Sequence, residues 1–552
     1  MGLYVLAFPY HPALRSPNEL CRLWQTRALV DFHTLSLNRA IATWGWVGDL
    51  SRMGNTLYPS KAPLLSFLDV PVYAGLRLYY GNAPDAVPEL ALVFWSRLFI
   101  TVLPTLLMLI LVRRFLRTYL SPRIADGLTA TYALGTLAFS YSLLFMSHQT
   151  TAVLVFSCFY VVWRCLRGDW CGWRRWAGLL LAGALGGATV AAEYTGALPV
   201  LAVYVWACVA VVRERSGETT SARSRAWAIS RELAFDALLT ALGALPFLAF
   251  LMWYHARCFG GPFESGYKHL NDPGYQPWHL GGFLGIRYPD PRAFMLSYFS
   301  PLRGLFTLAP FLLFAPFGAL RMRRQIREAL RAETPGPFSP AADRTLPVLV
   351  WLLLAGYTYF TSSFAYDSWG WTTGPRHLTP LVPFLLLPVG LVLEMAQQGG
   401  AVARIVSGIA AALCAGAVIV TGTLSLVNYI PDSVSNAFFA LAVPLFRHGY
   451  LPPSVLGFVL PNPWSGTPLL VLVAVAAVLV FVALTPRDPK RAVASPVPVV
   501  AAVLVLACYF GALALSARHD ARDAGALRHL QQDWVQPVNG TIGSRPSAGG
   551  PT

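Results

Sequence analysis

The sequence is poor in charged residues. Only 12% of its 552 residues are Asp, Glu, Lys or Arg, whereas a soluble protein carries roughly 25%. Hydrophobic residues make up 55% of the chain. This composition cannot cover the surfaces of the several soluble domains that the length alone would suggest. The shortage of charge therefore excludes a disordered chain, a coiled coil and a string of soluble domains, and it predicts a membrane protein.

Lysine and metal-binding cysteine patterns are also scarce. Lysine occurs only at Lys61, Lys268 and Lys490, although the chain has 42 basic residues. The eight cysteines are scattered, and their spacing matches no zinc or haem motif. We therefore expect no cofactor; a divalent metal is compatible with the sequence but not indicated. The net charge is +16. Because the arginines lie in the connections between apolar segments, we do not interpret this charge as a sign of a nucleic-acid partner.

Apolar blocks of helical length make up most of the chain. A hydrocarbon core about 30 Å thick needs about 20 apolar residues per helix. Gly2–Phe8 is apolar but too short to cross, so we interpret it as a partial helix or as the remnant of a first span; no signal peptide is expected there. The sequence predicts an all-α polytopic bundle of about 12–13 transmembrane helices. The predicted spans are 88–112, 124–145, 150–166, 177–192, 197–212, 232–253, 303–320, 345–364, 377–396, 405–427, 467–485 and 496–516.

Arginine clusters lie in alternate connections between these spans. The clusters are Arg113 to Arg123, Arg164 to Arg175, Arg213 to Arg231, Arg321 to Arg331, and Arg487 to Arg491. The positive-inside rule assigns such connections to the cytoplasm. The opposite connections are then predicted to lie outside: 11–87, 146–149, 193–196, 254–302, 365–376, 428–466 and the tail from 517.

The chain accordingly divides into five predicted parts. They are a partial first span (1–10), a first outer loop with amphipathic helices (11–87), a transmembrane core (88–396), C-terminal transmembrane helices (397–516) and an outer tail (517–552). The tail is predicted to be disordered after Val535, because its composition is polar and rich in glycine and proline.

Few ionisable residues fall inside the predicted spans. They include Arg97, Asp236 and Glu394. Transporters and pumps usually place charges or broken helices at mid-membrane depth, where the substrate binds. Here the acids, bases and aromatic residues gather in the outer connections instead. This distribution favours an enzyme that works at the outer membrane–water boundary over a transporter.

The first outer loop places Glu19, Asp49 and Lys61 close to a predicted lipid surface. Ser16 and Glu19 match a capping box with Pro17 at the first helical position, so Glu19 either closes a helix or acts chemically. The helix that follows is amphipathic and is expected to lie in the interface plane. Asp49 is either a turn residue or a catalytic acid. Lys61 is either an interface anchor or a phosphate contact.

Two runs in this loop resemble a known family. They are SPNELCR at 16–22 and DLSRMGNTLYPSKAP at 49–63. Both resemble the first periplasmic loop of C-superfamily (GT-C) glycosyltransferases, and in particular the bacterial family-39-like enzymes related to protein O-mannosyltransferases and the aminoarabinose transferase of lipid A. Those multi-span proteins take a sugar from a polyprenyl-phosphate lipid. Their loop carries an acid and then a Tyr-x-x-Lys-x-Pro segment, which implies that Glu19 is the catalytic acid and that Lys61 contacts the lipid phosphate.

The resemblance extends to about residue 395 through five segments in outer connections. They are FMSH (145–148), EY (193–194), CFGGPF (258–263), SPLRGLF (300–306) and WGWTTGPRHL (369–378). With the Tyr-x-x-Lys-x-Pro segment they imply that the substrate is bound by Tyr58, His148, Glu193, Tyr194, Trp369, Trp371 and His377. Arg376 and Arg303 are the further candidates for the donor phosphate, since arginine donates paired N–H groups. Each also has a structural alternative, such as an interfacial histidine or a snorkelling arginine.

One departure from the family concerns a metal. Asn18 stands where many relatives have a second acid, which speaks against a metal-binding acidic pair.

The resemblance implies transfer of a sugar from a polyprenyl-phosphate donor to an acceptor hydroxyl, with inversion at the anomeric carbon. The expected partners are the donor lipid, a glycan, lipid or protein acceptor, and the bilayer. Glu19 is the expected base and Asp49 the second candidate. The expected location is the bacterial cytoplasmic membrane, with the active site on its outer side. A lipid-linked glycan flippase or other transporter, an O-antigen ligase-like protein and a non-catalytic membrane subunit remain as alternatives.

Overall fold

Ten helices in the described part of the chain are long and apolar enough to cross a membrane. This confirms the prediction of an all-α polytopic membrane protein. The computed structural model describes residues 2–8, 16–81, 83–216, 221–282, 285–331, 336–364, 370–461, 463–486 and 496–534. The ten helices are Glu89–Leu116, Ser147–Leu166, Trp173–Ala192, Tyr194–Arg215, Ala222–Phe259, Leu346–Ser363, Arg376–Leu393, Ala401–Val427, Thr467–Leu484 and Pro496–Ser516.

The elements up to the middle of the chain follow the order of the predicted spans. They are α1 (Gly2–Leu6), α2 (Pro17–Asp31), α3 (Asn38–Trp44), β1 (Leu50–Met53), β2 (Thr56–Pro59), α4 (Leu64–Tyr80), α5 (Glu89–Arg97), η1 (Leu98–Val102), α6 (Leu103–Leu116), α7 (Pro122–Leu134), α8 (Leu137–Ser142), α9 (Ser147–Leu166), α10 (Trp173–Ala192), η2 (Tyr194–Gly196), α11 (Ala197–Arg215) and α12 (Ala222–Phe259).

The second half adds short helices around the remaining spans. They are η3 (Gly266–His269), α13 (Gln276–Leu280), α14 (Pro291–Phe299), α15 (Leu305–Leu308), η4 (Pro310–Phe314), α16 (Ala315–Arg331), α17 (Ala341–Arg344), α18 (Leu346–Ser363), η5 (Arg376–Leu381), α19 (Val382–Leu393), α20 (Met395–Gln398), α21 (Ala401–Val427), η6 (Phe438–Ala442), α22 (Val443–Arg447), η7 (Val455–Phe458), α23 (Thr467–Leu484), α24 (Pro496–Ser516), α25 (Ala521–His529) and η8 (Leu530–Trp534).

Two of the twelve predicted spans are interrupted helices. The span predicted at 124–145 is split into α7 and α8 at Gly135 and Thr136, and the Thr136 hydroxyl caps α8 by accepting the Ala138 N–H at 3.2 Å. A side chain at Gly135 would lie 2.9 Å from the backbone nitrogen of Val418, so the chain needs glycine there. The span predicted at 303–320 is split where Pro310, which lacks an N–H donor, begins η4.

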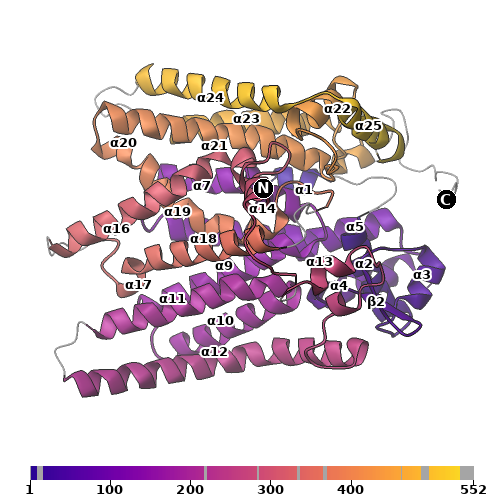
Figure 1. The fold of residues 1–552 in the computed structure, drawn as a ribbon, viewed down its shortest axis with the longest axis horizontal. Coiled ribbons are helices and arrows are strands. Elements are labelled where there is room, and N and C mark those ends of the chain that lie inside the picture. The colour runs from indigo at the N-terminus through magenta and orange to yellow at the C-terminus, as the bar shows by residue number, and fades with distance from the viewer. Residues whose placement is uncertain are drawn as a thin grey trace.

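The bundle has two distinct ends (Figure 1). One end carries α16, α17 and α20, at the left of the view, and we call it the arginine-rich end because α16 contains five arginines. The other end carries α2, α3, α13 and α25, at the right, and we call it the loop-rich end. The long α12 runs between the two ends. Segments predicted to share a side of the membrane thus come together in space.

The first loop folds onto the loop-rich end, and its described residues are 16–81 and 83–87. The predicted helix forms as α2, but ten of its fifteen residues are buried. Most of the surface of α2 therefore contacts protein and not lipid. Its polar residues find hydrogen-bond partners within the protein; Gln25, for example, donates to the Tyr254 hydroxyl at 2.8 Å. The loop also forms an unpredicted antiparallel hairpin, β1–β2, in which Leu50 pairs with Pro59.

The first and last described segments also pack against the bundle. In α1 the hydroxyl of buried Tyr4 donates to the Ala133 carbonyl. In the last described segment, Asp523 of α25 accepts hydrogen bonds from the backbone N–H and the hydroxyl of Ser435, each at 2.7 Å. The segment predicted to be disordered after Val535 lies outside the described residues.

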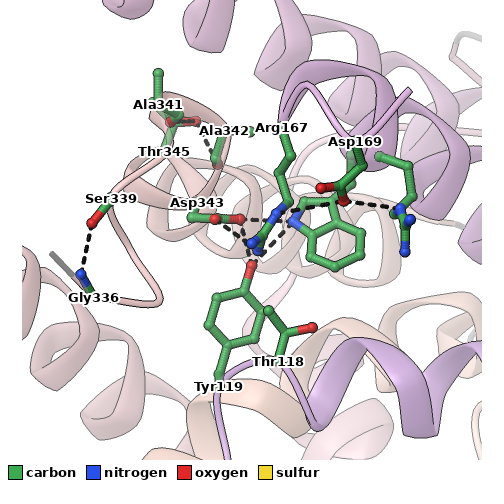
Figure 2. A network of polar contacts seen from close by, with 12 residues as sticks. Thr118, Tyr119, Arg167, Asp169, Gly336, Ser339, Ala341, Ala342, Asp343 and Thr345 are labelled. Carbon is green, nitrogen blue, oxygen red and sulfur yellow. Dashed lines mark hydrogen bonds and ion pairs between the residues drawn. The ribbon is translucent and has the colours of Figure 1, made fainter. Parts of the chain in front are cut away.

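A buried polar network braces the arginine-rich end (Figure 2). Asp343 of α17 is fully buried and pairs with Arg167 at 2.9 Å, and Tyr119 donates its hydroxyl proton to the same carboxylate. The indole N–H of Trp163 donates to Asp343 Oδ1 at 2.7 Å. This network ties the ends of α6 and α9 to α17.

Candidate functional site

A cavity of about 960 Å³ opens at the loop-rich end of the bundle. This volume is typical of pockets that hold a small-molecule ligand or cofactor. Its wall divides into two kinds of surface. The polar part includes Asp49, Lys61, His148, Glu193, Tyr267, His279, Arg376 and His377. The apolar part includes Leu198, Leu248, Leu251, Met252, Ile286, Phe360 and Phe364.

The β1–β2 hairpin brings Asp49 and Lys61 together. Asp49 directly precedes β1 and Lys61 follows β2, so the antiparallel register places them side by side. The Ser60 N–H and hydroxyl both donate to the Asp49 carbonyl, at 2.9 and 2.8 Å. As a result, the Lys61 ammonium lies 3.1 Å from Asp49 Oδ1. Both residues face the cavity, and the lysine side chain is only 10% exposed.

Charge governs the protonation of this pair. Burial alone would raise the pKa of Asp49, but the positive charges of Lys61 and Arg376 outweigh it and hold that pKa below its ordinary value. Burial alone would lower the pKa of Lys61, yet the Asp49 carboxylate and then Tyr267 keep it above its ordinary value. The site therefore presents a stable ion pair with a second cation, Arg376, near it.

The loop between α12 and α15 covers the hairpin and adds aromatic residues. The Ser51 hydroxyl donates to the Gly266 carbonyl at 2.6 Å, and a side chain at Gly266 would lie 2.9 Å from the Ser60 backbone, so the close approach requires glycine. This contact sets the Tyr267 ring 5.3 Å from the Lys61 ammonium. His279 stacks on Tyr267, and burial followed by the charge of Lys61 lowers the pKa of His279 to about 4, so it is neutral at pH 7.

The start of the helix that contains η5 and α19 also lines the cavity. Arg376 and His377 begin that helix, directly after the predicted WGWTTGP segment. The rings of His148 and His377 lie 5.0 Å apart, and His148 also contacts Tyr141. The Tyr141 hydroxyl donates to the Thr373 carbonyl at 2.8 Å, which fixes the turn before Arg376.

Glu193 is held at the cavity wall by a chain of polar contacts. The Ser147 hydroxyl donates to Glu193 Oε2 at 2.5 Å, and Arg22 donates to the Ser147 hydroxyl at 3.1 Å. Arg22 also donates to the backbone carbonyl of Asn18 at 2.8 Å and to its side-chain amide oxygen. The partner that a buried carboxylate at this turn requires is thus a serine that is itself bound by an arginine.

Glu19 lies behind this wall and does not line the cavity. Its side chain is fully buried, and Oε1 pairs with the Arg97 guanidinium at 2.8 Å. The same oxygen accepts the Phe145 N–H at 2.6 Å. Ser16 directly precedes α2 at the N-cap position, as predicted, but its side chain makes no capping hydrogen bond. Glu19 therefore neutralises the arginine of the first long span.

The other predicted residues occupy different places. Tyr194 and Trp371 line the cavity, and the Tyr194 hydroxyl bonds to His255 at 2.9 Å. Tyr58 packs against Phe259 and does not line the cavity. Arg303 is buried outside the lining. Trp369 lies outside the described residues.

Two cavity residues carry no sequence motif that would have identified them. His279 lies in α13, and Asp432 accepts the Trp371 indole N–H at 3.2 Å. Neither is close in sequence to a predicted site segment. Among the described residues, no cluster of three or more His, Cys, Asp or Glu side chains is placed to hold a metal ion.

Comparison with known proteins gives structural neighbours only. No protein-family model matches the sequence, and a search of curated proteins finds no significant match. ArnT from Cupriavidus metallidurans in the apo state is 16% identical, with 93% of this chain and 76% of ArnT covered and a TM-score of 0.44. The same protein bound to undecaprenyl phosphate gives 15% identity, 92% and 75% coverage, and a TM-score of 0.41.

A third solved structure is also similar. It is the oligosaccharyltransferase AglB from Archaeoglobus fulgidus in complex with an inhibitory peptide and a dolichol-phosphate, with 11% identity, 92% of this chain and 52% of AglB covered, and a TM-score of 0.39. ArnT and AglB are both membrane glycosyltransferases with the GT-C fold. Similarity at this level does not assign a function, which has to follow from the chemistry of the cavity.

Proposed function

We propose that the protein transfers a sugar from a polyprenyl-phosphate donor to an acceptor hydroxyl in this cavity. The observation that carries the proposal is the pair formed by Asp49 and Lys61, with Arg376 near it, in a cavity that is also lined by many apolar residues. A donor of this class has the same two parts, an anionic phosphate with a sugar and a long hydrocarbon tail. The carbohydrate, lipid or protein nature of the acceptor is open in this proposal.

Lys61 and Arg376 bind the donor phosphate. When the acceptor oxygen attacks the anomeric carbon, the bond between that carbon and the phosphate oxygen breaks and negative charge develops on the leaving phosphate. Fixed cations stabilise such charge most effectively where water is excluded. The buried side chain of Lys61 meets that condition, because its ammonium is held by Asp49 and by the Tyr267 ring before any substrate arrives.

Asp49 takes the proton of the acceptor hydroxyl. Its carboxylate faces the cavity, whereas Glu19, the base expected from the sequence, is enclosed with Arg97. Binding of the donor phosphate to Lys61 draws that cation away from Asp49 and so strengthens the carboxylate as a base. A single displacement of this kind inverts the anomeric carbon. His148, Glu193 and Trp371 are placed to contact the sugar.

Purified protein incubated with a panel of polyprenyl-phosphate sugars tests the activity. We expect release of free polyprenyl phosphate with at least one donor when a suitable acceptor is present. Movement of intact sugar-linked lipid across a reconstituted bilayer, without cleavage, would identify a transporter instead. Cleavage restricted to diphosphate-linked glycans would identify a ligase-like enzyme.

Replacing Lys61 with alanine should weaken binding of polyprenyl phosphate roughly 10- to 100-fold, because a hydrogen bond to a charged group contributes about 1.5–3 kcal/mol. Binding is measured with the lipid in detergent micelles. Lys268→Ala is the matched control, since Lys268 is exposed and pairs with exposed Glu264 at 3.0 Å. Equal affinities of the Lys61 and Lys268 variants would reduce Lys61 to an interface anchor.

The pH dependence of transfer follows from the same pair. Because the pKa of Asp49 lies below 3.8 and that of Lys61 above 10.5, both groups stay charged near neutrality. The depressed pKa means that the carboxylate is lost only as the pH falls below the ordinary Asp value. We expect kcat/KM for the donor, which reports the free protein, to be nearly constant between about pH 5 and pH 8. An acidic limb centred near pH 6.5 would contradict Asp49 as the base and would point to a histidine.

We further propose that the cavity faces the outer side of a bacterial cytoplasmic membrane. The support is the placement of charge, since α16 with its five arginines lies at the opposite end of the bundle from the cavity-forming first loop (Figure 1). A membrane-impermeant thiol reagent applied to intact cells tests this. A single cysteine introduced at exposed Asp272 should react, and one introduced at exposed Arg327 should not.

A further inference from the structure

A second polar cavity lies at the arginine-rich end of the bundle, far from the candidate active site along the chain's long helices. Its volume is about 340 Å³. It is formed where the end of α6 approaches the end of α9. Its lining consists of Arg114, Arg117, Thr118, Tyr160, Trp163 and Arg164.

Positive charge exceeds negative charge around this cavity. Arg113 and Arg117 share a single carboxylate, that of Asp126, at 2.8 and 2.6 Å. Within the described ranges of the chain, Arg114 is exposed and forms no ion pair. Arg164 lines the cavity and pairs with Asp169 at 2.9 Å. The lining thus presents three guanidinium groups against too few carboxylates to neutralise them.

The floor of the cavity is rigid. Trp163 is only 2% exposed, and its indole N–H is fixed by Asp343 Oδ1 at 2.7 Å and by the Tyr119 hydroxyl at 3.0 Å. Figure 2 shows how Tyr119 and Arg167 converge on Asp343. The arginines therefore surround a preformed surface that does not have to be ordered when a ligand binds.

Exposed tryptophans place the cavity at the level of the lipid headgroups. Trp173 and Trp176, at the start of α10, are 70% and 51% exposed. Tryptophan is enriched at the membrane–water interface, where its ring sits among the headgroups. Arg164 lies two residues before the end of α9, and α10 begins after a short turn. Arg164 at the end of α9 and these indoles at the start of α10 therefore lie at the same end of the bundle.

We propose that this cavity binds the phosphate group of an anionic phospholipid at the arginine-rich face of the membrane. Guanidinium groups bind phosphate oxygens through paired N–H donors, and basic pockets between membrane helices bind anionic headgroups. The proposal is independent of the sugar-transfer function, because none of the cavity's residues contacts the active-site cavity.

Native mass spectrometry with phosphatidylglycerol and with phosphatidylcholine tests the proposal. Purified wild-type protein should retain phosphatidylglycerol in preference to phosphatidylcholine. The double variant Arg114→Gln/Arg117→Gln should lose this retention about tenfold or more, as expected when charge-assisted hydrogen bonds are removed. Asp126 keeps Arg113 as its partner in that variant, so folding is preserved. Arg114→Lys/Arg117→Lys keeps the charge and should retain an intermediate amount.

Arg323→Gln/Arg327→Gln is the matched control. It removes the same charge from exposed positions of α16 at the same end of the molecule, and it should leave retention unchanged. Equal loss in both double variants, or equal retention in the wild type and the Arg114/Arg117 variant, would overturn the proposal. A third result would overturn the lipid assignment and identify a site for free phosphate. In that case millimolar inorganic phosphate would displace the lipid, and phosphate would bind to the lipid-free wild type but not to the Arg114/Arg117 variant.

Discussion

Replacing Asp49 with asparagine should lower the turnover of sugar transfer by about 10²- to 10⁴-fold, which is the usual contribution of a positioned general base. The substitution keeps the shape of the side chain but removes its capacity to accept a proton. Asp49 adopts a left-handed backbone conformation, with φ of 57°, and asparagine tolerates that region as well as aspartate does. The hairpin should therefore form normally, and the loss should appear in turnover.

Asp272→Asn is the matched control for this experiment. Asp272 is an exposed acid in the loop that covers the hairpin, so it undergoes the same chemical change on the same side of the protein. Its turnover should equal that of the wild type. Polyprenyl phosphate should still bind to the Asp49 variant, because Lys61 and Arg376 remain. A variant with near-normal turnover would show that Asp49 is not the base.

Replacing Glu19 with glutamine should destabilise the protein by about 3–5 kcal/mol, because removal of one partner of a buried ion pair leaves the other charge uncompensated. Glu19 is fully buried and Arg97 is nearly so, with side chains 0% and 3% exposed. The arginine would then remain inside a membrane-spanning helix without a counter-charge. The change is measured as a shift in thermal or denaturant-induced unfolding in detergent.

The double variant Glu19→Gln/Arg97→Gln separates this structural role from catalysis. Removing both charges should recover much of the lost stability, and transfer activity should recover with it. If Glu19 were instead the base, activity would stay low in the double variant even when stability returns. That second result would contradict the assignment of the proton transfer to Asp49.

The membrane spans were predictable from sequence because their length and hydropathy are properties of each segment alone. The breaks at Gly135 and Pro310 were not, since the first depends on the backbone of Val418, far away in the chain. The same contrast holds in the first loop. The Tyr-x-x-Lys-x-Pro segment pointed to Lys61, and the structure places that lysine on the cavity wall beside Asp49.

Glu19 illustrates what a local motif does not contain. The capping box and the family resemblance both drew on the residues around it, whereas its burial depends on Arg97, which lies 78 positions away. His279 and Asp432 also line the cavity. They belong to segments far along the chain, and no local sequence pattern connects these segments with the first loop. Long-range contacts of this kind determine which acid faces the substrate and which one neutralises an arginine. The roles of the cavity residues themselves remain predictions.

A structure of the protein with bound polyprenyl phosphate tests the central claim most directly. The account predicts that the phosphate oxygens lie within hydrogen-bonding distance of the Lys61 ammonium and the Arg376 guanidinium, and that the prenyl chain follows the wall formed by Leu198, Leu248 and Phe360. A phosphate bound elsewhere, with the ion pair of Lys61 and Asp49 undisturbed and the cavity empty, would contradict it.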